Sequence, residues 1–398
     1  MSKCVTVYTQ AYNVENYIEQ CIKSVLSQTF QDFEWILVEN GSTDKTREII
    51  RKYAALDERI KPDYFDVNQD GFTNYYIAEK ADGRYIVKID SDDWIEPEYL
   101  EKLIAPFEDP DVDISICGAV NYEEETGRET PHEYGELDGV YSKSDIEKQF
   151  IEMRSYMGTY WGKMFRREIF CSILPDMKEI GEKLKKGDNF GGDVAFALCY
   201  LGECKKLAFV NERMYHYRIH NNSYATRTIG TNRVFSCLAL RETEHHFLHT
   251  VNAYTEQNVI MVDLLFWQNI EQLFKNIIRA DWDTDQKIKT ISEVCANKDL
   301  QLLRKEAYNS KVRTILMGDI AWCYMNAGNS KYLKNVLMLL EPDIFDSISN
   351  ETYEWMRENQ ILMSYIIMGE FDNAKRYMEE ITTGNNVDYI RELQQRMH

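Results

Sequence analysis

The alternation of two hydrophobic periodicities through the first 120 residues is the feature that most restricts the fold of this chain. Short runs of β-branched and aromatic residues predict strands, and apolar residues spaced three or four apart predict amphipathic helices between them. The predicted strands cover residues 4–9, 33–39, 60–65, 84–90 and 113–120, and the predicted helices cover 14–26, 44–55, 73–80 and 97–104. This rhythm is typical of an α/β fold with a mainly parallel central sheet flanked by helices.

The rest of the chain predicts a change to all-helical structure near residue 230. Before that point the pattern predicts a polar hairpin or loop over 121–143, a helix after Ser144, a Lys/Gly-rich loop over 181–192, a helix opened by Asp193, and short strands over 207–210 and 213–217. Beyond it, helices are predicted over 259–278, 311–327 and 351–368. Helix-turn-helix units centred on Gly328 and Gly369 indicate either a tetratricopeptide-type repeat or an irregular helical domain. We therefore expect two domains, residues 1–230 and 231–398.

The composition argues against several kinds of partner. Acidic residues outnumber basic ones 66 to 46, a net charge of -20, which disfavours nucleic acid and broad electrostatic docking on anionic membranes. Nine scattered cysteines without a CxxC pair predict reduced core thiols. The chain has neither an apolar stretch of transmembrane length nor a signal-peptide core. We expect a cytoplasmic protein, free or peripheral at the inner face of the membrane.

The strongest candidate site is the run Asp90-Ser91-Asp92-Asp93 at the end of a predicted strand. Parallel sheets bind ligands at the carboxyl ends of their strands, so the residues after such a strand are the place to search. Three carboxylates in four residues repel one another, and a divalent cation that bridges to a diphosphate would compensate them. Hard oxygen ligands suit Mg²⁺ or Mn²⁺. The alternative is a solvated acidic turn that caps the helix after Pro97.

Two further strand and loop ends carry candidate residues. Glu39 ends the second strand and is suited to accept from an imide or hydroxyl donor, although its segment also fits a plain turn in which Asp44 caps the next helix. Asp193 follows a Gly pair and could act as a general base, or simply as the N-cap of its helix. Asp188, earlier in the same loop, is the fallback for that role.

Two histidine-containing segments differ in how strongly they indicate a metal or phosphate site. Residues 215–223 bring His220 close to a guanidinium, which fits either a phosphate or metal site or an amphipathic edge strand. His245 and His249 lie four apart, and a solvated helix face explains them better than a metal site, because no further ligand follows at the right spacing. The sequence contains no Walker loop, GxGxxG or GxSxG, which counts against P-loop enzymes, classical dinucleotide-binding dehydrogenases and α/β-hydrolases.

Up to about residue 225 the chain resembles the family-2 glycosyltransferases, which have the GT-A fold. The resemblance rests on short segments that follow one another in the family's order. They are AYNVE at 11–15, LSQT at 26–29, GSTD at 41–44, GRYI at 83–86 leading to DSDDW at 90–94, WGKMFRR at 161–167, GD at 192–193, and YR at 217–218 with Ser223. The remaining C-terminal residues lie outside the resemblance.

The resemblance implies roles for individual residues. Tyr12 and Glu39 would face the nucleotide base, with Glu39 accepting from the uracil imide, and Asp193 would be the catalytic base. The metal would be held by Asp92, with Asp93 and His220 as further contacts. The implied donor-binding residues are Gln10, Tyr12, Asn13, Glu39, Asp90, Ser91 and Asp92.

The implied function is inverting, Mn²⁺- or Mg²⁺-dependent transfer of a hexose or N-acetylhexosamine from a UDP-sugar. The acceptor would be a hydroxyl of a cell-surface glycan or glycoconjugate, whether glycan, lipid-linked or protein. The helical C-terminal part would bind the acceptor or form a homo-oligomer. The chain departs from the family pattern at Gln10, Asn40, Asn74 and Gly192. These departures leave a second reading open, a non-catalytic module that binds a sugar nucleotide or a protein. A third, a sugar-1-phosphate nucleotidyltransferase, would need a basic Gly-rich loop after the first strand, which TQAYNVEN lacks.

Overall fold

The computed structural model describes residues 4–69, 73–132, 137–188, 190–220 and 232–280, and residues 282–307 with gaps. Contacts divide the chain into two compact units. The first unit comprises Met1–Leu184, Gly191–Arg227 and Glu242–Val259, and the second comprises Lys185–Phe190, Thr228–Arg241 and Ile260–His398. The chain therefore crosses between the units more than once. The single boundary expected near residue 230 stays a prediction.

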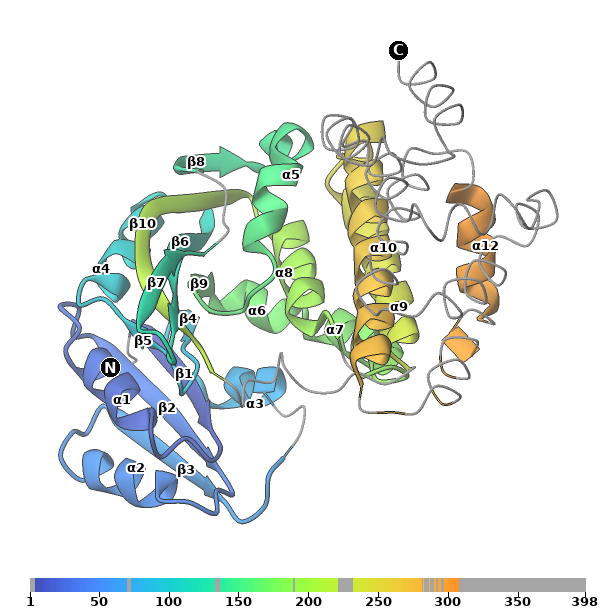
Figure 1. Cartoon of the computed structure of the whole chain (residues 1–398). Coiled ribbons are helices and arrows are strands. Elements are labelled where there is room, and N and C mark those ends of the chain that lie inside the picture. The colour runs from blue at the N-terminus through green and yellow to red at the C-terminus, as the bar shows by residue number, and fades with distance from the viewer. Residues whose placement is uncertain are drawn as a thin grey trace, which may run out of the picture. The chain divides into compact units, whose positions relative to one another are not determined.

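One ten-stranded sheet forms the centre of the first unit as far as the structure describes it (Figure 1). The strands are β1 (Val5–Ala11), β2 (Phe33–Asn40), β3 (Ile60–Phe65), β4 (Tyr85–Lys88), β5 (Trp94–Ile95), β6 (Val112–Glu123), β7 (Arg128–Pro131), β8 (Gly139–Ser142), β9 (Lys163–Arg166) and β10 (Lys206–Ile219). Their order is β3-β2-β1-β4-β9-β6-β10-β5, with β7 beside β6 and β8 beside β10. Pairing is parallel among β3, β2, β1 and β4 and between β6 and β10, and antiparallel in the other ladders.

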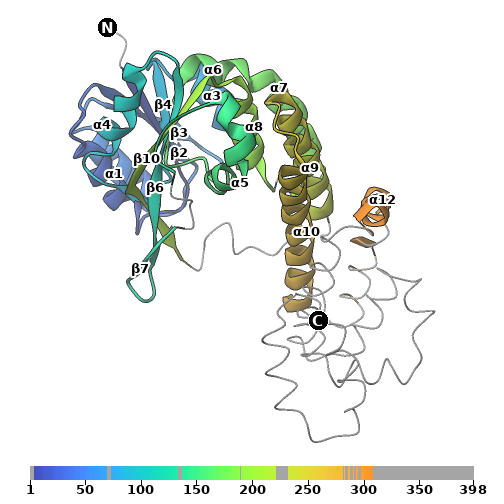
Figure 2. The same cartoon turned by 90° about the horizontal axis from the view of Figure 1, so that it is seen from above.

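The helices follow the strands along the chain. They are α1 (Ile18–Leu26), α2 (Thr46–Ala54), α3 (Thr73–Lys80), α4 (Tyr99–Ile104), α5 (Ile146–Tyr156), α6 (Arg167–Ser172), α7 (Leu174–Leu184), α8 (Gly192–Glu203), α9 (Arg233–Thr250), α10 (Glu256–Arg279) and α12 (Lys298–Ala307). Figure 2 shows α1 and α4 on one side of the sheet and α6 and α8 on the other. Among the described residues, no helix is both long and apolar enough to cross a membrane.

The hydrophobic spacing of the sequence explains this packing. In α1 the buried residues are Ile18, Cys21, Ile22 and Val25, which recur at intervals of three and four and so lie on one face. All eight residues of β2 are buried, because the strand has a neighbour on each side and is covered on both faces. The α/β fold with a mainly parallel sheet, predicted from the sequence, is confirmed.

Several predicted elements agree with the structure closely. β3 and α3 have the predicted bounds, and α10 contains the helix predicted over 259–278. Asp44 accepts a hydrogen bond from Thr46 N at 3.0 Å at the start of α2, although Lys45 is the N-cap residue. The helices predicted over 311–327 and 351–368, and the units at Gly328 and Gly369, lie outside the described residues.

Three predictions about elements were wrong, and some elements were missed. The segment 181–192 is not wholly a loop, because α7 extends to Leu184 and buries that residue. The two short strands after residue 206 are one strand, β10, whose register against β6 shifts between Val210 and Arg213. The strand β5 was not predicted, because two residues are too few to show a periodicity. Finally, Gly191 is the N-cap of α8, in the left-handed conformation at φ 80°, and Asp193 lies inside the helix.

Candidate active site

The carboxyl ends of β1, β2 and β4 lie together at one edge of the sheet. Ala11 pairs with Glu39 in the parallel β1–β2 ladder, and Tyr8 pairs with Lys88 in the parallel β1–β4 ladder. The segments that follow these strands, including residues 90–93, therefore leave the sheet at the same edge. This is the edge at which parallel sheets bind ligands, and the one the sequence indicated.

The loops after β1 and β2 brace each other at this edge. Asn13 has a left-handed backbone, with φ 52°, which its short polar side chain tolerates. Its amide donates to Ser42 Oγ at 3.1 Å, and its side-chain oxygen accepts from Thr43 N at 2.8 Å. Between the braced loops and the strand end, Tyr12 keeps 39% of its surface exposed, while Gln10 is partly buried. A rigid rim with an exposed ring is an arrangement on which a flat base can stack.

Glu39 lies deeper than its predicted role suggests. It is fully buried, and its Oε1 accepts from Ser42 N at 2.6 Å. Its Oε2 accepts a hydrogen bond from Arg47, which also donates to the carbonyl of Phe65 on β3. A nucleotide base that donates to Glu39 would therefore share an oxygen already used within the chain. The contact of Glu39 with a uracil imide stays a prediction.

Lys88 and Asp90 form an ion pair where β4 ends. Lys88 Nζ lies 2.9 Å from Asp90 Oδ1, and the two side chains are 19% and 34% exposed. Burial alone would lower the pKa of Lys88, but the carboxylates of Asp90 and Asp193 outweigh it and raise that pKa. The lysine therefore stays charged, and it neutralises the first carboxylate of the acidic run.

Asp92 contacts His220, the residue that follows β10. His220 Nε2 lies 3.0 Å from Asp92 Oδ2, and the imidazole is 8% exposed while the carboxylate is 28% exposed. Burial, then the charge of Asp90, raises the pKa of Asp92, and the hydrogen bond from His220 opposes that rise. His220 Nδ1 is buried and has no hydrogen-bond partner. The fold thus brings together two of the three predicted metal contacts, which are far apart in the sequence.

Asp93, the third predicted metal contact, is held inside the domain. It is 1% exposed, and its Oδ2 accepts from the hydroxyl of Tyr215 at 2.7 Å, while its Oδ1 accepts from Arg218 N at 2.8 Å. Burial, together with the charges of its neighbours Asp92 and Asp90, raises the pKa of Asp93 well above its usual value. Both oxygens therefore anchor the acidic run to β10, and ligation of a metal by Asp93 stays a prediction.

Arg218 completes this anchor. Its Nε donates to Asp92 O at 2.8 Å, and an Nη donates to Gln20 on α1 at 2.6 Å. The guanidinium lies 4.8 Å from the ring centroid of Trp94 and 5.0 Å from that of Tyr17. Because a guanidinium between aromatic faces has little freedom to move, β10 fixes the backbone that presents Asp92. Ser91, predicted to bind the donor, is buried within the same turn.

The donor atoms around Asp92 suit a divalent cation bound together with phosphate. Among the described residues, no group of three or more His, Cys, Asp or Glu side chains is arranged to hold a metal ion. Mg²⁺ and Mn²⁺ are nevertheless often held by one or two protein ligands, with substrate phosphates and water supplying the rest. Asp92 Oδ2 and His220 Nε2, which lie 3.0 Å apart, are therefore the two atoms that would hold such an ion once it separated them.

Asp193 is the second residue of α8 and is exposed. The surrounding protein raises the pKa of its carboxyl by desolvation, Lys88 and Lys163 oppose the rise, and Asp90 adds to it. Because the side chain remains exposed, water limits the desolvation. The fold therefore brings Asp193 within electrostatic reach of the strand-end carboxylate Asp90. Asp188, the fallback base, belongs to the second unit, where it accepts hydrogen bonds from Arg233 and Ser236.

Lys163 on β9 is a buried lysine whose importance the sequence did not reveal. Its ammonium donates to Thr159 O at 2.6 Å, Thr159 Oγ1 at 2.9 Å and Trp161 O at 3.2 Å. Burial lowers the pKa of Lys163 to about 7, although nearby Cys117 and Asp193 oppose the change. The signal available was its motif, residues 161–167, but spacing alone could not place its side chain.

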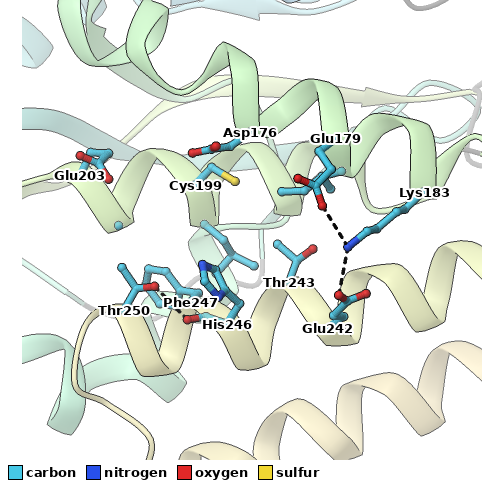
Figure 3. A pocket seen from close by; sticks show the side chains of 13 residues that line it. Asp176, Glu179, Lys183, Cys199, Glu203, Glu242, Thr243, His246, Phe247 and Thr250 are labelled. Atoms are coloured by element: carbon cyan, nitrogen blue, oxygen red, sulfur yellow. Dashed lines mark hydrogen bonds and ion pairs between the residues drawn. The ribbon is translucent and has the colours of Figure 1, made fainter.

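A separate hollow is lined by residues of α7, α8 and α9 (Figure 3). Its volume is about 380 Å³. Its lining includes Leu198 and Phe247, together with Lys183, which is paired with Glu242 at 3.0 Å and with Glu179 at 3.5 Å. None of the site residues predicted from the sequence lines it. The candidate active site is therefore the strand-end cluster.

Comparison with known proteins agrees with this geometry. Residues 6–174 match the sequence model of the family described as Glycosyl transferase family 2. The chain is 31% identical over 305 residues to EpsH of Bacillus subtilis (strain 168), which is named as a glycosyltransferase, covering 75% of this chain and 84% of EpsH. It is 41% identical over 99 residues to TuaG of the same organism, named as a teichuronic acid biosynthesis glycosyltransferase. That match covers 25% of this chain and 39% of TuaG.

A solved structure shares the fold. TarS 1–349 of S. aureus, crystallised in complex with UDP-GlcNAc, matches with a TM-score of 0.53 at 18% identity, covering 86% of this chain and 92% of that one. The fold is thus of the GT-A type. The chain belongs to glycosyltransferase family 2 and is an enzyme of that class, as its sequence led us to expect.

Proposed function

We propose that this enzyme transfers a hexose or N-acetylhexosamine from a UDP-sugar to an acceptor hydroxyl with inversion at the anomeric carbon. The observation that carries the proposal is the electrostatic interaction of Asp193, an exposed carboxylate at the start of α8, with Asp90, which follows β4. Inverting transfer needs a base near the acceptor and a charged cluster near the leaving diphosphate. The two carboxylates lie on different elements, as these two tasks require.

On this proposal Asp193 accepts the proton of the acceptor hydroxyl as the oxygen attacks the anomeric carbon. Burial raises its pKa, whereas Lys88 and Lys163 oppose the rise and so favour the ionised form that a base requires. An exposed position suits this role, because the acceptor must reach the carboxylate from solvent. No protein acid is required to protonate the leaving group, because a diphosphate departs without a proton.

Asp92 and His220 would hold Mn²⁺ or Mg²⁺ against the diphosphate of the donor. Such a cation neutralises the charge that develops on the leaving UDP. The residues of the chain do the rest of the positioning, because Arg218 and Asp93 lock the turn that presents Asp92. Tyr12, Asn13 and Gln10 would line the base and ribose.

The names of two relatives support the proposed donor and acceptor. TarS was crystallised with UDP-GlcNAc, which supports a uridine nucleotide in a fold of this type. TuaG is named for teichuronic acid biosynthesis, which supports a hydroxyl of a cell-surface polymer as the acceptor. We place the enzyme in the cytoplasm or at the inner face of the membrane, where such donors are made, and assign acceptor binding or self-association to the helical C-terminal part.

The test is to incubate the full chain with Mn²⁺, a panel of UDP-sugars and simple acceptors, and to measure the release of UDP. We expect release with one or a few UDP-sugars, dependent on the divalent cation and suppressed by EDTA. The anomeric configuration of the product, read by NMR coupling constants, tests the inversion. Retention of configuration, or release that is indifferent to EDTA, would contradict the corresponding part of the proposal.

A further inference from the structure

Lys88 is a charged residue in a strand that is otherwise apolar. Three of the four residues of β4 are buried, and Lys88 is the partly buried one at the site edge. Its Nζ lies 2.9 Å from Asp90 Oδ1 and 5.3 Å from the ring centroid of Tyr160. Burying a lysine in a strand costs free energy unless its charge is paired with an opposite charge. The pairing of Lys88 with Asp90 therefore explains why a lysine is tolerated at this position.

Strand pairing sets Lys88 beside a second lysine that has a different task. Val87 pairs with Met164 in the antiparallel β4–β9 ladder, and one further step brings Lys88 opposite Lys163. The ammonium of Lys163 is fully engaged with Thr159 and Trp161, and so it stabilises the turn before β9. The ammonium of Lys88 instead turns to the site carboxylates.

Electrostatic interactions tie Lys88 to both ends of the proposed reaction. Asp90 and Asp193 each raise the pKa of Lys88, and in return Lys88 is the strongest influence that lowers the pKa of Asp193. The other groups acting on Asp193 are Asp90 and Lys163, and Asp193 in turn acts on Tyr160. Tyr8 also faces Lys88 from β1. The ammonium of Lys88 thus interacts electrostatically with both Asp90 and Asp193, which are more than a hundred residues apart in the sequence.

We propose that Lys88 is a positioning residue that fixes Asp90 through its ion pair and acts on Asp193 through its positive charge. The proposal rests on the role of Asp193 given above. In this proposal the side chain of Lys88 connects Asp90, on the donor side of the site, with the base Asp193. A side chain that only filled space at this position would leave the ionisation of Asp193 unchanged.

The variants are Lys88→Met, which removes the charge, and Lys88→Arg, which keeps it. Lys80→Met is the matched control, because Lys80 also pairs with a carboxylate, Asp63, at 4.0 Å and lies 5.5 Å from the ring centroid of Tyr76, outside the site. We expect Lys88→Met to move the acidic limb of the kcat/KM profile up by about one pH unit, the lower end of the shift caused by a nearby opposite charge. Lys88→Arg should restore the profile, and Lys80→Met should not alter it.

A second measurement separates this inference from the proposed function. The Asp193 carboxyl is titrated by ¹³C NMR of aspartate-labelled protein, with Asp193→Asn identifying its signal and Lys88→Gln as a further uncharged variant. A higher Asp193 pKa in Lys88→Met and Lys88→Gln supports the link whether or not turnover is found. An unchanged Asp193 titration overturns it even in an active enzyme. If the pKa shifts but Asp193→Asn retains full turnover, the base assignment fails while the link between Lys88 and Asp193 stands.

Discussion

At the scale of single residues, the two roles considered for Asp193 can now be separated. Gly191, and not Asp193, is the N-cap of α8. Asp193→Asn should therefore change the free energy of unfolding by about 1 kcal/mol or less, through the helix dipole and the opposing charges of Lys88 and Asp90. If Asp193 is the base, turnover should fall roughly 10²–10⁴-fold with UDP affinity unchanged.

Steady-state kinetics and isothermal calorimetry with UDP check this prediction. Asp188→Asn is the control, because Asp188 pairs with Arg233 in the second unit and should retain turnover. Turnover of Asp193→Asn within a few-fold of wild type would remove Asp193 as the base and return attention to Asp188.

The metal contact gives a second prediction. Asp92→Asn should abolish Mn²⁺-dependent UDP binding without weakening the fold, because it removes a carboxylate whose charge raises the pKa of its buried neighbour Asp93. Asp111→Asn, which also removes one surface charge, should leave UDP binding as in wild type. Calorimetry of UDP with and without Mn²⁺ makes the measurement. Wild-type affinity in Asp92→Asn would contradict the metal assignment.

The lowered pKa of Lys163 predicts an unusual dependence of the folding stability on pH. Its pKa is about 7 in the folded protein and near the ordinary 10.5 in the unfolded chain, so between these values the unfolded chain binds one more proton. Stability therefore rises with pH across this window, by up to about 1.4 kcal/mol per unit. Relative to Lys163→Met, the wild type should gain stability from pH 7 to pH 9. Chemical denaturation at several pH values tests this, and parallel curves for the two proteins would show that Lys163 does not titrate there.

At the scale of elements, α5 and α9 are joined by a buried ion pair. Arg154 and Glu244 are 9% and 1% exposed, and Arg154 Nη2 lies 2.6 Å from Glu244 Oε1. Glu244→Ala would leave a buried guanidinium without its partner, at a cost of about 3–5 kcal/mol. The double variant Arg154→Met with Glu244→Leu should recover most of that loss. Urea denaturation of the wild type, Glu244→Ala and the double variant measures the three free energies of unfolding. An equal loss of stability in both variants would mean that lost packing, and not the unpaired charge, is responsible.

The elements also explain what the sequence could and could not predict. β3 and α3 were found because their periodicity lies within a few consecutive residues. α7 was missed because its lysines and Gly181 suggested a loop, although Leu174 and Leu184 are buried. The acidic run was found because strand and carboxylates are adjacent in the chain. The bonds of Tyr215 and Arg218 to Asp93 join positions more than a hundred residues apart, which no local pattern reports.

At the scale of the whole molecule, the division into units predicts where the chain can be shortened. The first unit includes Glu242–Val259, in which Phe247 is 3% exposed and its ring centroid lies 6.1 Å from that of Phe150 on α5. A chain that ends at residue 230 would expose this surface, and should melt at a lower temperature or aggregate. A chain that ends at residue 259 should stay folded and bind UDP. Thermal melting and calorimetry compare the two, and an equally stable 1–230 chain would place the boundary where the sequence first suggested.

The mutual bracing of the loops after β1 and β2 has a consequence for the evolution of donor choice. Asn13 is bonded to both Ser42 and Thr43, so neither loop can adopt a new course while the other keeps its own. A change from one nucleotide base to another would then require matched substitutions in two segments about thirty positions apart. Mutant libraries that vary one loop alone should mostly yield proteins that no longer bind the old donor and do not bind a new one. Libraries that vary both loops together should yield proteins that bind a new donor.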